Sequence, residues 1–123
     1  MNELDRQVGG THYTKMKYQP FELIRRTGID FFCGNVVKYV SRYKNKNGVE
    51  DLQKAMHYIQ YMREKNVWQH PVVDWEIDLK MYCTANNIGK LEYSIMESTI
   101  RCNYHNALSY IAELIKNEGG ANE

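Results

Sequence analysis

Four polar side chains that could hold an anion follow one another at helical spacing near residue 40. Asn35, Lys38, Tyr39 and Arg42 occupy positions i, i+3, i+4 and i+7 of a helix predicted over residues 31–43, so they share one face of it. Arginine can clamp a phosphate with two parallel hydrogen bonds, while lysine adds a point charge. This face is a candidate phosphate site, and a merely solvated helix face is the alternative.

A second polar face follows a short basic turn. Asp51, Lys54 and Tyr58 occupy positions i, i+3 and i+7 of a helix predicted over residues 49–65. Two helices joined by so short a turn are antiparallel neighbours, so the two polar faces can meet. A pocket of cations, an amide, phenols and a carboxylate suits a phosphorylated small molecule.

Some of these side chains have competing interpretations. Asp51 could hold Mg²⁺ through water, but an ion pair with Lys54 or Arg42 is favoured. Lys46, in the basic turn, could close over a phosphate or only keep the turn soluble. The tyrosines could stack on a nucleobase, yet amphipathic core or interface positions are just as common for them.

The segment before the first helix adds two candidates. His12 and Tyr13 directly follow Gly9 and Gly10, and glycines let the backbone approach a ligand closely. Histidine titrates near neutrality, so His12 could bind a phosphate or act as a general acid or base. The alternative is a surface residue without a role in binding.

The elements that must position these residues are all helical. Apolar residues recur with a period near 3.6 and no alternating strand pattern is longer than four residues, so we expect a compact all-α domain of five to six helices. They are predicted over residues 20–26, 31–43, 49–65, 74–85, 90–100 and 104–117.

Local signals mark the ends of these helices. Pro20 suits a first helical position and Gly28 a helix stop. Asp30, Asp74 and Asn103 stand where a side chain can cap the helix that follows. We also expect the two tryptophans to pack the junction between the two halves of the chain.

Composition limits the class of protein. With 123 residues, 43% hydrophobic, the chain predicts one soluble domain over residues 1–123. A net charge of +1 makes nucleic acid an improbable partner, although residues 1–70 carry +5 and the rest −4.

Three unclustered cysteines and no long apolar run indicate a reduced, cytoplasmic protein without a membrane span. Opposed charges and ten tyrosines favour a homo-oligomer.

Four short motifs together resemble the SaV-like family of small phage proteins. They occur in the family's order over residues 9–64, whereas residues 74–118 form a separate C-terminal helical half. The motifs read Gly-Gly-Thr-His-Tyr from residue 9, Gln-Pro-Phe-Glu from 19, Gly-Asn-Val-Val-Lys-Tyr-Val-Ser-Arg from 34 and Glu-Asp-Leu-Gln-Lys-Ala-Met-His-Tyr from 50.

The resemblance implies a function in phage nucleotide metabolism, because the family includes a nucleoside monophosphate kinase. If the protein is such a kinase, Lys38 and Arg42 would neutralise charge, His12 is the candidate general acid or base, and Mg²⁺ would bridge the phosphates as a cofactor. Substrate contacts would come from Asn35, Tyr39, Lys46, Lys54, Tyr58 and Tyr13. The alternatives are a non-catalytic protein that sequesters a nucleotide, a protein that binds host machinery and, less favoured because carboxylates are few, an all-α nucleotide pyrophosphatase.

Overall fold

A computed structural model describes residues 16–119, and these residues form six α-helices and no strand. The all-α fold and the predicted helices are confirmed, with differences of at most two residues at their ends. A single 3₁₀ turn, η3, directly follows α2. The helices are α1 (Pro20–Thr27), α2 (Phe31–Arg42), α3 (Val49–Glu64), α4 (Trp75–Ala85), α5 (Lys90–Ile100) and α6 (Tyr104–Gly119), and η3 covers Tyr43–Asn45.

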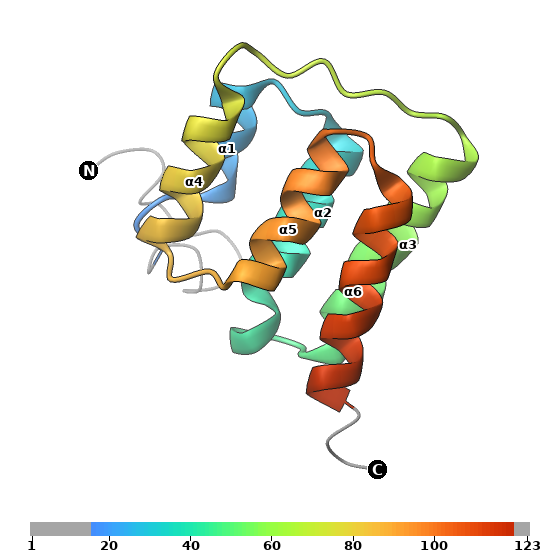
Figure 1. Cartoon of the computed structure of the whole chain (residues 1–123). Coiled ribbons are helices and arrows are strands. Elements are labelled where there is room, and N and C mark those ends of the chain that lie inside the picture. The colour runs from blue at the N-terminus through green and yellow to red at the C-terminus, as the bar shows by residue number, and fades with distance from the viewer. Residues whose placement is uncertain (1–15, 120–123) are drawn as a thin grey trace.

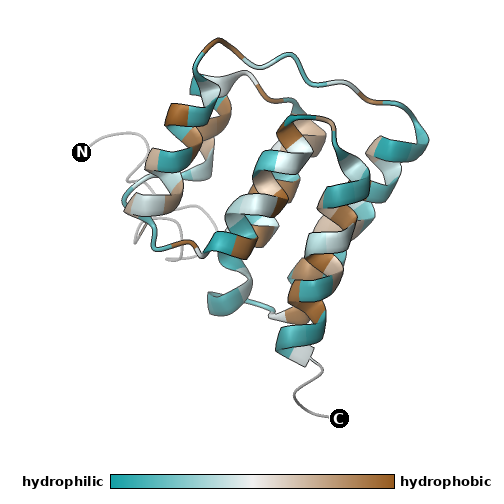
Figure 2. Ribbon diagram, viewed as in Figure 1, coloured by the Kyte–Doolittle hydropathy of each residue, from teal (hydrophilic) through white to brown (hydrophobic). Residues whose placement is uncertain are grey.

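The helices form two layers of three. One layer holds α1, α2 and α3, and the other holds α4, α5 and α6 (Figure 1). Each helix of the first layer packs on its counterpart in the second: α1 on α4, α2 on α5 and α3 on α6. Hydrophobic residues gather where the layers face each other (Figure 2), and the most deeply buried ones come from both layers, including Leu23, Val36, Ile59, Leu79 and Ile111.

Most of the predicted helix ends are confirmed. Pro20 opens α1, and Gly28 ends it with φ 77°. The Asp30 carboxylate accepts a hydrogen bond from the Cys33 amide at 2.9 Å and so caps α2. Asn103 accepts one from the Asn106 amide at 3.3 Å at the start of α6.

Two expectations near the junction of the halves are wrong. Asp74 precedes α4, but its φ is 68° and its side chain makes no capping hydrogen bond. Of the two tryptophans, Trp75 is buried as expected, whereas Trp68 is 68% exposed. Sequence cannot foresee this, because the exposure of a residue in a connection depends on how distant helices meet.

The connection between α3 and α4 is held to the bundle by specific contacts. The Val72 amide donates to the Thr27 carbonyl at 2.8 Å, and the Tyr104 hydroxyl donates to the Val67 carbonyl at 2.5 Å. Gln69 accepts a hydrogen bond from the Asp30 amide at 3.0 Å. Among residues 16–119, no helix is long and apolar enough to cross a membrane.

Candidate functional site

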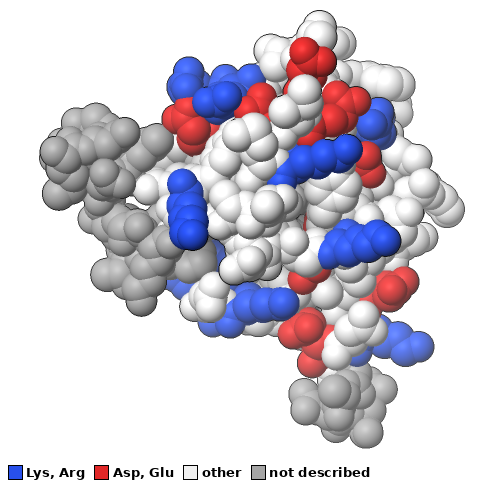
Figure 3. Space-filling view, turned by 60° about the vertical axis from the view of Figure 1, so that its left-hand side comes forward, with Lys and Arg blue, Asp and Glu red and all other residues white. Residues whose placement is uncertain are grey.

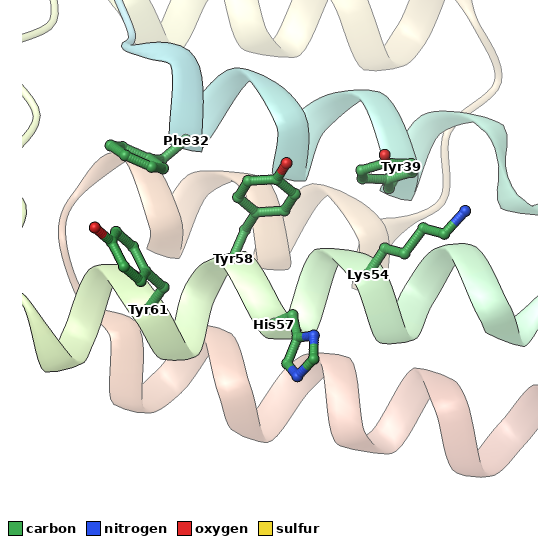
Figure 4. A pocket seen from close by; sticks show the side chains of 6 residues that line it. All are labelled: Phe32, Tyr39, Lys54, His57, Tyr58 and Tyr61. Carbon is green, nitrogen blue, oxygen red and sulfur yellow. The ribbon is translucent and has the colours of Figure 1, made fainter.

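A groove runs along the seam between α2 and α3, which lie antiparallel beside each other. It has a volume of about 390 Å³, within the range of roughly 300–1,000 Å³ typical of small-molecule sites. Aromatic rings from both helices line it, with a lysine and a histidine from α3 (Figure 4). The lining residues are Phe32, Tyr39, Lys54, His57, Tyr58 and Tyr61.

Cations surround the Tyr39 ring at one end of this groove. The Lys38 ammonium lies 4.5 Å from the ring centroid, the Lys54 ammonium lies 5.5 Å from it, and the Arg42 guanidinium carbon lies 4.8 Å from it. Among the described residues, no carboxylate lies within ion-pair distance of Lys38 or Lys54. Lys38 and Lys54 therefore meet here without a neutralising carboxylate from residues 16–119, which is an attractive environment for a phosphate group.

Arg42 has a further contact, with a buried carboxylate. Its Nε and Nη2 each lie 3.2 Å from an oxygen of Asp51. The Asp51 side chain is fully buried, and the Arg42 side chain is 15% exposed. The Asn47 amide donates to the same carboxylate at 3.2 Å. The ion-pair interpretation of Asp51 is confirmed, with Arg42 rather than Lys54 as the partner.

This pair sets the protonation of Asp51. Burial acts to raise the pKa of the carboxyl, but the hydrogen bonds from Arg42 and the Asn47 amide act against it, and the pKa is lowered on balance. Asp51 is thus an anion at neutral pH, with both oxygens engaged. The described residues contain no cluster of three metal-binding side chains. Direct binding of Mg²⁺ would require Asp51 to release Arg42, so the cofactor remains a prediction without support from this geometry.

The other end of the groove is aromatic. The Tyr39 and Tyr58 rings are stacked with centroids 6.2 Å apart, and the Phe32 and Tyr61 rings lie 5.2 Å apart. Phe31 bridges the two pairs, because its ring contacts both Tyr58 and Phe32 edge-on. Tyr61 remains 44% exposed and Phe31 69% exposed. These aromatic rings offer flat apolar surfaces on which a planar ring of a ligand can stack.

Of the remaining predicted residues, the two that the structure describes, Asn35 and Lys46, do not line the groove. Asn35 is buried, and its amide donates to the Phe31 carbonyl of its own helix at 2.9 Å. Lys46 is exposed in the turn before α3. His12 and Tyr13 lie outside the described residues.

Sequence reasoning missed Phe32, His57 and Tyr61 as lining residues. The spacing carried a signal, because His57 and Tyr61 stand four residues apart on α3 and Tyr58 lies beside them. That pattern also fits a helix that buries its aromatic residues, so only the packed structure distinguishes the two.

Comparison with known proteins leaves the function open. Residues 9–60 match the model of a family described as a protein of unknown function, DUF3310. The matched segment is less than half of the chain and contains α1, α2 and most of α3. No curated protein and no solved structure gives a match. The matched segment supplies every lining residue of the groove except Tyr61.

Proposed function

We propose that the groove between α2 and α3 binds a phosphorylated small molecule with a planar ring, most concretely a nucleoside monophosphate. The observation that carries this proposal is the division of the groove into a cationic end and an aromatic end. Lys38 and Lys54 would hold the phosphate beside Tyr39. The base would stack on the rings between Tyr58 and Tyr61.

The two lysines and Arg42 have different roles in this proposal: the lysines would contact the ligand, whereas Arg42 stabilises the structure around it. Lys38 and Lys54 are partly exposed and have no carboxylate partner among the described residues, so they are available to an anion. Arg42 is tied to buried Asp51, so it positions Tyr39 and the adjoining turn and contributes positive potential rather than a flexible clamp.

A more specific version of this proposal is that the protein is a kinase, and this version rests on the sequence resemblance. In that form Lys38 and Arg42 would neutralise charge during phosphoryl transfer, with positioning as the main source of catalysis. Incubation with a labelled nucleoside triphosphate and each monophosphate separates the enzyme from a binder. Formation of a diphosphate product supports the kinase, whereas binding without turnover supports sequestration.

The binding proposal is tested by thermal unfolding with nucleoside mono-, di- and triphosphates, each with and without Mg²⁺. A ligand at 100 times its Kd should raise the free energy of unfolding by about 2.7 kcal/mol. Changing Lys38 and Lys54 together to alanine should weaken binding at least tenfold and leave the melting temperature of the free protein almost unchanged. Lys90→Ala, which changes an exposed lysine at the start of α5, is the matched control. If the double variant binds as tightly as the parent, the groove is not the phosphate site.

A further inference from the structure

The residues that α3 contributes to the groove form a diamond on the surface of that helix. Lys54, His57, Tyr58 and Tyr61 occupy positions i, i+3, i+4 and i+7. Lys54 and Tyr61 therefore stand at the two ends of the diamond, with His57 and Tyr58 at its sides. The ends lie about 10 Å apart along the helix axis. A ligand that extends from Lys54 to Tyr61 passes between His57 and Tyr58 (Figure 4).

Both residues at the sides can form hydrogen bonds with such a ligand. Among residues 16–119, neither the imidazole of His57 nor the hydroxyl of Tyr58 has a hydrogen-bond partner. The Tyr58 ring is fixed by its neighbours, because the Tyr39 ring is stacked with it at 6.2 Å and the Phe31 ring meets it edge-on at 6.3 Å. A neutral imidazole and a phenol can each donate one hydrogen bond and accept another.

The distribution of charge sets the direction of the ligand. Lys38 and Lys54 meet at one end of the groove, and no carboxylate of residues 16–119 lies within ion-pair distance of them. On the face of the molecule toward α1 and α4, by contrast, basic and acidic side chains are interspersed (Figure 3). The phosphate of a nucleotide would therefore lie beside the two lysines. Its base would then reach the ring of Tyr61, and its sugar would lie between His57 and Tyr58.

We propose that His57 and Tyr58 bind the two adjacent hydroxyls of a ribose, so that the groove selects ribonucleotides over 2′-deoxyribonucleotides. This inference rests on the proposed function, because it takes the ligand to be a nucleoside monophosphate. Of the described residues that line the groove, His57 and Tyr58 are those that place polar atoms beside the middle of the ligand. Two groups that each donate and accept match two neighbouring hydroxyls, and 2′-deoxyribose leaves one of these groups without its partner on the sugar.

Calorimetric titration of the full chain tests the inference. The four ribonucleoside monophosphates are titrated first, and the tightest is compared with its 2′-deoxy and 2′,3′-dideoxy forms. The parent should lose about fivefold in affinity with each hydroxyl removed, which corresponds to one net hydrogen bond. The double variant His57→Leu/Tyr58→Phe should bind all three ligands with the same affinity, because it keeps the Tyr58 ring but removes both polar groups.

A matched control makes the same chemical changes outside the groove. His105 and Tyr110 lie on α6 and do not line the groove. His105→Leu/Tyr110→Phe should therefore preserve the parent's order of affinity for the three ligands. A control that also loses the preference would overturn the inference, because the preference would then not depend on the groove.

The other outcomes separate this inference from the function on which it rests. If no nucleotide binds, the proposed function is wrong and the ribose inference is overturned with it. If nucleotides bind, and changing Lys38 and Lys54 to alanine weakens them, but the parent does not distinguish the three sugars, the ribose inference alone is overturned. A preference that survives in His57→Leu/Tyr58→Phe would also overturn it, since other residues would then recognise the sugar.

Discussion

At the scale of single residues, the contact between Arg42 and Asp51 changes the role expected of an arginine beside a phosphate site. On a merely solvated helix face, Arg42 would contribute little to folding. In the structure Arg42 instead binds a fully buried carboxylate through two of its nitrogens. Removing one partner of such a pair leaves an uncompensated buried charge and costs about 3–5 kcal/mol.

This pair should make stability depend on acid pH. The pKa of Asp51 is lowered in the folded protein, so the carboxylate contributes stability above its unfolded pKa of about 3.9 and loses it as pH falls through the folded value. Asp51→Asn should lower the free energy of unfolding by about 3 kcal/mol at neutral pH. The difference from the parent should shrink steadily below about pH 4.

Urea unfolding of both proteins between neutral and acid pH measures that difference. Arg42→Ala, compared at neutral pH, should also be destabilised, whereas Lys54→Ala should not. A constant gap between Asp51→Asn and the parent at all pH values would mean that the ion pair is not its cause.

At the scale of the helices, capping of α2 sets the start of the helix that carries Lys38 and Tyr39. Asp30→Ala should cost about 1 kcal/mol of stability, because the Cys33 amide loses its acceptor. Asp30→Asn keeps an acceptor oxygen and should remain within a few tenths of a kcal/mol of the parent. Thermal unfolding distinguishes the two variants, and equal losses would show that the negative charge matters more than the cap.

The helices were predictable from the sequence because each one carries a continuous apolar stripe and most carry a local stop signal. The stripe that ends in Leu114 on α6 and the stop at Gly28 are clear examples. The exposure of Trp68 and the backbone of Asp74 were not predictable, because both depend on how the chain crosses from one layer to the other.

The candidate site was predictable only in its polar part. Helical spacing brings Lys38, Tyr39, Arg42, Lys54 and Tyr58 together, and the structure does so. Asn35 was predicted at this site but does not line the groove, because its side-chain amide donates a hydrogen bond to the Phe31 carbonyl of its own helix. The aromatic end formed by Phe32 and Tyr61 emerges only from the way α2 and α3 are set side by side.

At the scale of the whole molecule, the core is shared between the two halves of the chain. Ile59 of α3 and Ile111 of α6 are both fully buried, and their helices pack on each other. The segment that matches the uncharacterised family therefore buries much of its apolar surface against α5 and α6. Without that partner the apolar faces would be exposed to water.

We accordingly expect a fragment of residues 1–72 to lack cooperative unfolding and most of its helix signal in circular dichroism. Mixing it with a fragment of residues 73–123 should restore both, since the cut falls beside Val73, which is 87% exposed. A fragment 1–72 that melts cooperatively by itself would mean that the first three helices form an independent domain.

The connection between α3 and α4 has a consequence for how this fold tolerates change. It has no regular structure, yet Val67, Gln69 and Val72 each bind a distant part of the bundle. Loops normally accept inserted sequences because few contacts hold them. Here an inserted sequence would disturb contacts with α1, α2 and α6 at the same time. Although the segment is a loop, we therefore expect it to be among the positions of the chain that tolerate insertions least.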